Sequence, residues 1–472
     1  MDLSLVKRLQ EEILKNNFFL QNNLKALFYK RAFFLSSFNQ IKPCQMTINT
    51  IHSLFLECSK VSTDTRIIEK DCMFVALKGN NFDANSFAKE AFEKGAKYVI
   101  IDNKNYYINK KTILVKDCLE TLQELAKFHR TYLGLPIIAL TGSNGKTTTK
   151  ELINAVLSKK YNTIATIGNF NNHIGVPLTL LRFSKETELG IVEMGANHQK
   201  EIAFLCEIAQ PDYGYITNFG KAHLEGFGGV EGVIKGKSEM YNYLKEHNKL
   251  VFVNVDDAIQ NEKTSHINRY TFSTLNYNAS VNISKIEANP MVIINYNNLT
   301  INSRLIGIYN ANNINAAITI GKYFKVNDEA IKDAVENYIP DNNRSQLIQK
   351  NGNEIILDAY NANPSSITAA ITNFIQLKKV NKIAILGDMF ELGTESLLEH
   401  NKIVKMLINE FEITTFFIGK YFYANKISSN HIAFFEDFSS FSKFIQENKP
   451  INSLLLIKGS RGMALEKTLE IL

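Results

Sequence analysis

Short apolar runs alternate with helical patterns along most of the chain. Between residues 46 and 134 the runs CMFVALKG and KYVIID alternate with the amphipathic segments NSFAKEAFEKGA and CLETLQELAKFHRTYL. Such alternation is typical of an α/β domain with a largely parallel sheet. It predicts a small α/β domain that ends at LGLP, where Gly134 and Pro136 mark a linker.

The same alternation begins again after the linker. The apolar run IIAL leads into a glycine-rich loop, and an apolar stripe through residues 152–157 predicts the helix that follows. The later runs LGIVEMG, YGYITNFG and KLVFVNVDD each end in polar residues. In an open parallel sheet the ligand crevice lies at the carboxyl ends of the strands. We therefore expect Glu193, Asn218, Asn254 and Asp257 to approach one edge of a second domain.

Two further patterns complete the chain. Residues 270–306 alternate apolar and polar positions, which predicts antiparallel strands attached to the second domain. After residue 340, the runs EIILDAY, KIAILGDM, TFFIGK and SLLLIKG are separated by helical segments and predict a third, Rossmann-like α/β domain. The predicted fold class is α/β with three domains, at residues 46–134, 135–340 and 341–472.

Residues 1–45 differ from the rest, with seven Lys or Arg against three Asp or Glu and a broken helical pattern. They could form a basic amphipathic helix for a surface or a partner. We favour a dispensable extension translated from an upstream start codon, because Met46 begins the well-patterned segment.

Composition narrows the class of protein. The chain has 472 residues, of which 45% are hydrophobic and 21% charged, as in ordinary globular proteins. Its net charge of +6 is small and no basic stripe carries interleaved aromatics, so we expect no nucleic-acid partner. No apolar run approaches the roughly 18 residues of a membrane span, and no signal peptide begins the chain, so we expect a cytoplasmic protein. The cysteines lack metal or CxxC spacing and fit reduced thiols: Cys44, Cys58, Cys72, Cys118 and Cys206.

The segment TGSNGKTTTKE, residues 141–151, indicates a nucleotide site. It resembles the phosphate-binding pattern GxxxxGK[ST] but has two residues fewer between its glycines. A strand, a glycine turn and a helix N-terminus direct backbone N–H groups and a positive dipole at one anion. The alternative is a glycine turn with a surface lysine. We predict that the ATP phosphates contact Gly142, Ser143, Asn144, Gly145, Lys146, Thr147 and Thr148.

Three further side chains are candidates for the chemistry. Phosphoryl transfer needs metal ions held by carboxylates, and Glu193 in IVEMGANH ends a strand expected beside the loop. His223 could be a metal ligand, a base or a surface histidine. Lys237 begins a helical pattern and would by default be exposed.

Taken in order, the motifs resemble those of the Mur ligase family from Met46 to the C-terminus. The matching segments are STDTR, FVALKG, TGSNGKTTTKE, GNFNNHIGVPLTLL, VEMGANHQKEI, AHLEGFGG, DAYNANPSS, LGDMFELG and KGSRGMALE. The resemblance accounts for the short loop, which this family carries as GxxGKT. The elements GNFNN, YNANP and LGDMxELG point to the family member that joins D-alanyl-D-alanine to UDP-N-acetylmuramoyl-tripeptide.

The resemblance implies a ligase of peptidoglycan synthesis that acts as a monomer. ATP would phosphorylate a carboxylate, and the amine of D-alanyl-D-alanine would attack the acyl phosphate, leaving a peptide bond, ADP and phosphate. The small first domain would bind the UDP-substrate and the central, mostly parallel domain would bind ATP. Two alternatives stay open: a Mur-type ligase with another amine substrate, and a P-loop ATPase or nucleotide-sensing module.

Catalytic roles follow only from the resemblance. Lys146 would hold the β- and γ-phosphates, Thr147 and Glu193 would bind one Mg²⁺, and His223 would bind a second. Lys237 matches a lysine that CO₂ converts to a carbamate, although Lys235 lies two residues away. A carbamate, unlike an ammonium, would suit a site with two cations.

Binding roles also follow from the resemblance. Asn310 and Asn313 would lie near adenine, with Tyr309 where the family usually has histidine. Asp358 would bind the ribose, and Arg344 would bind the phosphates once the third domain closes. This closure would gate the reaction. The predicted substrate contacts are Ser62, Thr65 and Arg66 for the UDP-sugar, then Asn169, Asn171, Asn172, Asn361, Asn363, Lys458 and Arg461.

Overall fold

A computed structural model describes residues 46–340 and 343–472. The predicted extension, residues 1–45, lies outside the described residues. The chain divides into two compact units, the first ending at Cys118 and the second beginning at Leu119. The predicted domain boundaries near residues 134 and 340 stay predictions.

The first unit contains a four-stranded parallel sheet of order β1-β2-β5-β6. Its central strands are buried except at Tyr98, as the runs CMFVALKG and KYVIID predicted, because both faces of a parallel sheet are covered. Its elements are α2 (Ile48–Phe55), β1 (Val61–Ser62), β2 (Met73–Val75), the hairpin β3 (Lys78–Gly79) and β4 (Phe82–Asp83), α3 (Ala88–Glu93), β5 (Tyr98–Ile101) and β6 (Thr112–Leu114).

The second unit begins with α4 (Cys118–Leu133, from Leu119 on) and a seven-stranded sheet of order β13-β12-β11-β10-β7-β9-β8. All its strands run parallel. The strands are β7 (Ile137–Thr141), β8 (Thr163–Ala165), β9 (Leu189–Glu193), β10 (Tyr213–Ile216), β11 (Leu250–Asn254), β12 (Asn268–Ser273) and β13 (Val281–Asn282).

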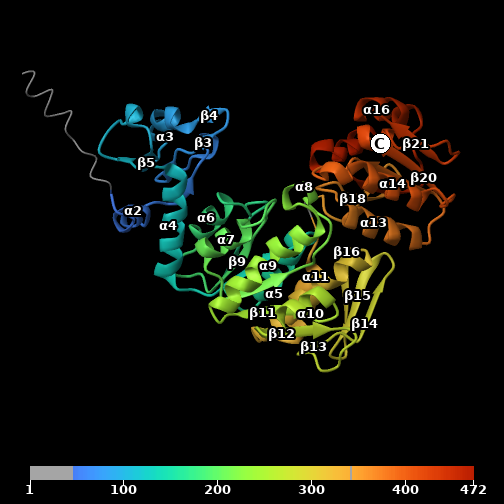
Figure 1. The fold of residues 1–472 in the computed structure, drawn as a ribbon, viewed down its shortest axis with the longest axis horizontal. Coiled ribbons are helices and arrows are strands. Elements are labelled where there is room, and N and C mark those ends of the chain that lie inside the picture. The colour runs from blue at the N-terminus through green and yellow to red at the C-terminus, as the bar shows by residue number, and fades with distance from the viewer. Residues whose placement is uncertain (1–45, 341–342) are drawn as a thin grey trace, which may run out of the picture. The chain divides into compact units, whose positions relative to one another are not determined.

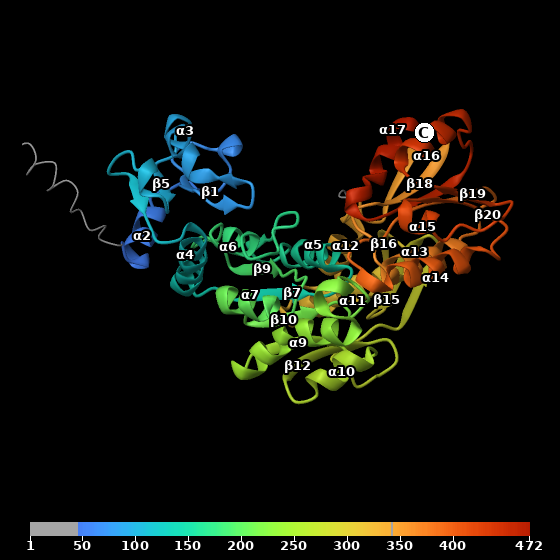
Figure 2. The same ribbon diagram turned by 45° about the horizontal axis from the view of Figure 1, so that its top comes forward.

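This part of the chain contains several helices, many of which pack on the seven-stranded sheet (Figure 1). They are α5 (Lys146–Leu157), α6 (Gly175–Leu180), α7 (Glu201–Ala209), α8 (Leu224–Phe227), α9 (Val230–Glu246), α10 (Ala258–Thr264), α11 (Ala311–Tyr323) and α12 (Asp328–Asn337). α12 packs against an added antiparallel sheet (Figure 2), formed by β14 (Lys285–Ala288), β15 (Met291–Tyr296) and β16 (Leu299–Ile306).

The prediction for residues 270–306 is correct only in part. Residues 285–306 form the antiparallel strands, whereas β12 and β13 extend the main sheet in parallel. Apolar and polar residues that alternate along a strand indicate that one face of the strand is buried. The alternation does not indicate whether the neighbouring strand runs parallel or antiparallel. Here α10 provides the crossover that makes β12 parallel to β11.

A third sheet has the order β17-β18-β22-β19-β20-β21, with β17 antiparallel at its edge. Its four buried parallel strands include the runs that predicted a Rossmann-like domain, and the helices surround them (Figure 1, orange to red). The elements are β17 (Gln346–Lys350), β18 (Asn353–Asp358), α13 (Pro364–Gln376), β19 (Lys382–Gly387), α14 (Ser396–Leu407), β20 (Ile413–Ile418), α15 (Lys420–Tyr423), β21 (Ile432–Phe435), α16 (Phe438–Glu447), β22 (Leu454–Lys458) and α17 (Thr468–Ile471).

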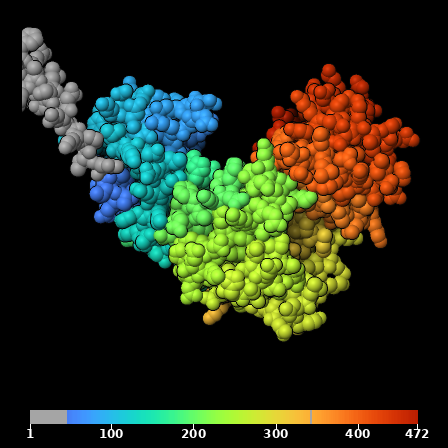
Figure 3. All heavy atoms as spheres, viewed as in Figure 1, coloured from blue at the N-terminus to red at the C-terminus, as the bar shows by residue number. Residues whose placement is uncertain are grey.

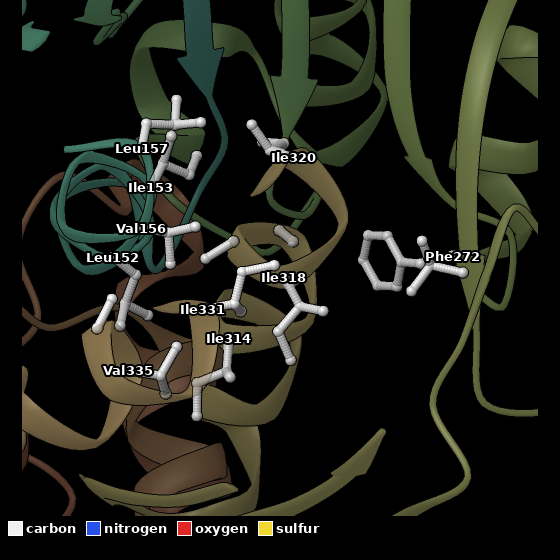
Figure 4. Close-up of a cluster of buried hydrophobic side chains, with 14 of the residues drawn as sticks. Leu152, Ile153, Val156, Leu157, Phe272, Ile314, Ile318, Ile320, Ile331 and Val335 are labelled. Atoms are coloured by element: carbon white, nitrogen blue, oxygen red, sulfur yellow. The ribbon is translucent and has the colours of Figure 1, made fainter. Parts of the chain in front are cut away.

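The main core lies between the seven-stranded sheet and helices α5, α11 and α12 (Figure 4). Leu152, Ile153, Val156 and Leu157 project from one face of α5, because residues spaced by three or four positions share a helix face. Each fully buried side chain of this size stabilises the fold by about 1.5–3 kcal/mol relative to an exposed one. The helix that begins at the glycine-rich loop is thereby anchored along its length.

No helix among residues 46–340 and 343–472 has the length and apolar character needed to span a membrane. The four cysteines described there are free thiols, in agreement with the prediction for those residues.

Replacing Ile314, which is fully buried on α11, tests this core. We expect Ile314→Ala to lower the free energy of unfolding by about 2–5 kcal/mol, because it leaves a cavity beside α5. Ile339→Ala is the matched control, since that side chain is 59% exposed. Denaturant unfolding followed by circular dichroism measures both, and equal losses would contradict the assignment of the core.

Candidate functional site

The loop between β7 and α5, residues 142–147, is called the phosphate loop below. Gly142 and Gly145 adopt positive φ angles of 145° and 77°, which glycine adopts without strain. The ammonium of Lys146 folds back and donates to the Gly142 carbonyl at 2.8 Å. Burial lowers the pKa of Lys146, while the nearby Glu193 carboxylate opposes that shift. The loop therefore presents one cation and a row of backbone N–H groups.

Residues that follow β10 hold the phosphate loop in place. The Thr217 hydroxyl donates to the Asn144 carbonyl at 2.6 Å, and the Asn218 amide donates to the same oxygen at 3.0 Å. Ser143 Oγ donates to the Gly220 carbonyl at 2.6 Å. The expected approach of Asn218 is thus seen. Asn254 and Asp257 instead order the turn before α10 and do not line the cavity described below.

Glu193 ends β9 beside the loop and is 1% exposed. Its Oε1 accepts hydrogen bonds from Asn171 Nδ2 at 2.8 Å and from Thr147 Oγ1 at 3.3 Å. Its buried Oε2 has no hydrogen-bond partner among the described residues. A carboxylate oxygen left without a donor beside a threonine hydroxyl fits a Mg²⁺ ion bound together with nucleotide phosphates, as Mg²⁺ prefers one or two carboxylates plus phosphate and water. Accordingly, no group of three His, Cys, Asp or Glu ligands occurs in the described residues.

A buried lysine that the sequence analysis missed supports Glu193. Lys150 is 3% exposed, and its ammonium donates to the Thr166 carbonyl at 2.7 Å. The Thr166 hydroxyl in turn accepts the N–H of Glu193 at 3.0 Å. Asn171 is held to the same strand end, because its carbonyl accepts the N–H of Gly195 at 2.7 Å. Lys150 lies within TGSNGKTTTKE, but its contact with Thr166 is visible only in the tertiary structure.

Lys237 lies on α9 and is fully buried. Its Nζ has no hydrogen-bond partner among the described residues and lies 5.3 Å from the centroid of the Phe227 ring. Burial lowers the pKa of Lys237 well below its usual value, and the charge of Lys146 adds to that shift. Lys235, by contrast, is exposed. The default expectation that Lys237 is exposed is therefore wrong, because it lies on the inward face of its helix.

His223 comes from the loop after β10 and contacts the loop that follows β19 of the third sheet. Its Nδ1 shares a hydrogen bond with Oε2 of Glu391, and this bond is the main cause that lowers the pKa of Glu391. Glu391 belongs to the quoted segment LGDMFELG, yet sequence analysis assigned it no role. The pair spans 168 positions along the chain.

The residues predicted for the adenine and ribose also lie together. The Asn313 amide donates to Asn310 Oδ1 at 2.8 Å, and Tyr309 OH bonds to Ser345 Oγ at 2.9 Å. Asp358 forms an ion pair with buried Lys458 at 2.6 Å.

Aromatic and amide contacts add to this side. The Arg344 guanidinium lies 3.9 Å from the centroid of the Tyr360 ring, and that of Arg461 lies 5.6 Å from the same ring. The Asn363 amide donates to Asn144 Oδ1 in the phosphate loop at 2.7 Å.

Many of these groups line one cavity of about 690 Å³ in the second unit. Gly142, Lys237 and Arg461 do not line it. Tyr360, Ser345, Ser365, Ser366 and His173 line it although sequence analysis did not select them. The predicted residues that do line it are Ser143, Asn144, Gly145, Lys146, Thr147, Thr148, Asn169, Asn171, Asn172, Glu193, His223, Asn310, Asn313, Arg344, Asp358, Asn361, Asn363 and Lys458.

The remaining candidates lie in the first unit. Arg66 pairs with both carboxylate oxygens of Asp64, and those hydrogen bonds lower the pKa of Asp64 to about 2. The Ser62 hydroxyl donates to the Asp64 carbonyl at 3.0 Å, and the Thr65 carbonyl accepts from Lys94 at 2.9 Å. Asp64 caps a short turn, and the Arg66 side chain is largely exposed.

Comparison with known proteins gives consistent matches. Residues 140–321 match the Mur ligase middle domain, and residues 343–461 match the Mur ligase, glutamate ligase domain. The UDP-N-acetylmuramoyl-tripeptide–D-alanyl-D-alanine ligase of Bacillus subtilis is 36% identical over 417 residues, covering 86% of this chain and 91% of that protein.

Solved structures agree. MurF from Acinetobacter baumannii has a TM-score of 0.78 at 29% identity, covering 90% of this chain and 97% of that one. MurF from Thermotoga maritima in complex with ADP has a TM-score of 0.77 at 26% identity, covering 88% and 97%.

Gly142→Ala tests the geometry of the phosphate loop. A Cβ at Gly142 would lie 1.9 Å from Thr217 Oγ1, so we expect ADP binding in calorimetry to fall at least 100-fold and the melting temperature to drop. Gly134→Ala is the control, because it also has a positive φ but no atom within 4 Å of the new Cβ. It should cost only about 1–2 kcal/mol of backbone strain. Unchanged ADP binding by Gly142→Ala would contradict the proposed contacts.

Proposed function

Because this chain belongs to the Mur ligase family, we propose that it uses ATP to join D-alanyl-D-alanine to UDP-N-acetylmuramoyl-tripeptide. The products are the UDP-linked pentapeptide precursor of peptidoglycan, ADP and phosphate. The observation that carries this proposal is the single cavity in which the phosphate loop, Glu193 and His223 meet Asp358 and Lys458 of the third sheet.

The phosphate loop and Lys146 would bind the β- and γ-phosphates through backbone N–H groups and one ammonium. Thr147 and Glu193 would hold one Mg²⁺, and His223 would hold a second. Such ions, when bound, neutralise the charge that develops on the phosphoryl oxygens. The orphaned Glu193 Oε2 supports the first site, and the cavity position of His223 supports the second.

The reaction would proceed in two balanced steps. The terminal carboxylate of the tripeptide attacks the γ-phosphorus, the bond to the bridging oxygen breaks, and ADP leaves. The neutral amine of D-alanyl-D-alanine then attacks the acyl carbon of the acyl phosphate through a tetrahedral intermediate. Inorganic phosphate leaves with the former carboxylate oxygen, and the amine loses a proton. Holding the three reactants in one cavity supplies much of the rate acceleration.

Asparagines and other polar side chains would bind the nucleotide and orient the two substrates. We propose that Asn169, Asn171 and Asn172 contact the tripeptide. Asn310, Asn313, Arg344 and Asp358 would bind the nucleotide, and Asn361, Asn363, Lys458 and Arg461 would contact the incoming dipeptide. In the first unit, Ser62, Thr65 and Arg66 would bind the UDP-sugar. Arg66 must then exchange its contact with Asp64 for a phosphate, and its exposure makes this exchange inexpensive.

Lys237 would act as a carbamate. Burial lowers the pKa of this amine well below its usual value, which favours the neutral form that reacts with CO₂. The nitrogen forms a bond to the carbon of CO₂, one proton is released, and a carboxylate-like anion results. Among the described residues, the Lys237 amine and the hydroxyl of Tyr241, one helical turn away, both lack a hydrogen-bond partner, which supports the addition of a polar group at this lysine. The burial of Lys237 and the exposure of Lys235 favour Lys237.

The reaction itself is tested by measuring phosphate release from the purified chain with ATP, Mg²⁺, UDP-N-acetylmuramoyl-tripeptide and D-alanyl-D-alanine. We expect release only when all four are present, with one peptide bond formed per phosphate. Turnover with single amino acids in place of the dipeptide would indicate a sister ligase. Hydrolysis of ATP without either acceptor would indicate an ATPase and overturn the proposal.

The carbamate is tested by Lys237→Ala, for which we expect a loss of activity of at least about 100-fold, the usual effect of removing one electrostatic stabiliser. A small carboxylate such as acetate or formate should restore part of it. Lys235→Ala is the matched control and should keep near-normal activity, because that side chain is exposed. Undiminished activity of Lys237→Ala would eliminate the carbamate.

A further inference from the structure

The loop that carries His223 is rigidly joined to the phosphate loop. Its first residues, Thr217, Asn218 and Gly220, hold Ser143 and Asn144 through the hydrogen bonds described above. The chain then reaches α8, which lies against the turn Gly393–Glu395 before α14. In Figure 3 the green atoms of the α8 region meet the orange atoms of this C-terminal part.

One ring nitrogen of His223 forms a hydrogen bond with a residue of the C-terminal part. Nδ1 bonds to the carboxylate of Glu391, and no hydrogen bond engages Nε2 within the described residues. When a carboxylate accepts the Nδ1 proton of a neutral imidazole, the lone pair is left on Nε2. Histidine ligands of metal ions commonly have such a second partner, which sets the tautomer and the ring orientation.

The turn that carries Glu391 is held from several sides. The N–H of Met389 donates to Nε2 of buried His400 at 3.0 Å, and the N–H of Phe390 donates to Ser460 Oγ at 2.9 Å. Asp388 accepts the N–H groups of Tyr421 and Phe422. These bonds fix the backbone on which Glu391 stands.

Both partners of the contact have left-handed backbone conformations, with φ of 54° at His223 and 63° at Glu391. Non-glycine residues in this region are uncommon, and the strain persists where surrounding contacts determine the conformation. The Glu391 carbonyl also accepts the N–H of Glu225 at 3.3 Å. Glu391 therefore meets the His223 loop through both its side chain and its backbone.

We propose that Glu391 is a positioning residue for His223: its carboxylate holds the imidazole in the tautomer that leaves Nε2 free for a metal ion. The inference rests on the proposed function, which assigns His223 to a Mg²⁺. Glu391 follows β19 of the third sheet, whereas His223 follows β10 of the seven-stranded sheet. This tautomer is therefore favoured only when the C-terminal part is docked on α8. The metal site is then complete only in the docked enzyme.

A second contact of the same loop provides an internal control. The Lys221 ammonium pairs with Glu399 at 2.8 Å, and the Lys221 N–H donates to Ser365 Oγ at 2.7 Å. Glu399 thus contributes to docking without touching the imidazole. Glu399→Gln weakens docking alone, whereas Glu391→Gln replaces the carboxylate by an amide that can donate to Nδ1 and select the opposite tautomer.

The experiment measures the tautomer and the metal site separately from turnover. The full chain, labelled at histidine and bound to ADP, is studied by long-range ¹H–¹⁵N NMR, which reports the tautomer of His223. The His223→Asn variant identifies the signals of this residue. Pulsed EPR of added Mn²⁺ detects the coupling between the ion and the imidazole nitrogen. The dependence of this coupling signal on Mn²⁺ concentration gives the affinity. Wild type, Glu391→Gln, Glu391→Asp and Glu399→Gln are compared.

We expect the Nδ1–H tautomer in wild type and its loss in Glu391→Gln. In that variant we also expect the affinity of the imidazole site for Mn²⁺ to fall 10- to 100-fold. Glu391→Asp should recover part of both effects, and Glu399→Gln should retain the wild-type tautomer. An unchanged tautomer and Mn²⁺ affinity in Glu391→Gln would overturn the proposal. Equal losses in Glu399→Gln would also overturn it, since docking alone would then account for them. Neither measurement needs turnover, so a failure of the ligase assay is distinguished from a failure here.

Discussion

The pairing of β7 with β10 on one side and with β9 on the other is the constraint on which the site depends. Because all three strands run parallel, their carboxyl ends and the residues that follow meet at one edge of the sheet. The phosphate loop follows β7, Glu193 ends β9, and the His223 loop follows β10. A cation, a carboxylate and an imidazole that lie far apart along the chain are therefore brought to one cavity by strand order alone.

The second unit also leaves ionisable side chains without hydrogen-bond partners, which ordinary folded interiors avoid. A buried charge or polar group without a hydrogen bond costs free energy, so each such group calls for an explanation. Glu193 Oε2 and Lys237 Nζ both lack partners within the described residues. A metal ion beside the first and a carbamate on the second would remove both deficits. In the proposed complex, relief of these two deficits would favour binding of the metal ion and formation of the carbamate.

Local patterns sufficed to predict the α/β class, the phosphate loop and the strand-end position of Glu193, because a glycine turn between a strand and a helix is a short-range feature. The running direction of β12 and β13 was not predictable, since burial alternation is the same for parallel and antiparallel neighbours. The roles of Lys150 and Glu391 were missed for a related reason. Their partners, Thr166 and His223, are identified only once the chain has folded. Lys237 was misjudged because its charge was given more weight than its spacing: Val233, Met240, Tyr241 and Leu244 mark the buried face of the same helix.

Asn144 gives the phosphate loop a direct link to the C-terminal part of the chain. Its side-chain carbonyl accepts a hydrogen bond from Asn363, which also caps the N-terminus of α13. Separation of the two parts would remove this bond and the positive end of a helix from the loop together. In the proposed reaction, the release of ADP would then be coupled to the loss of these contacts.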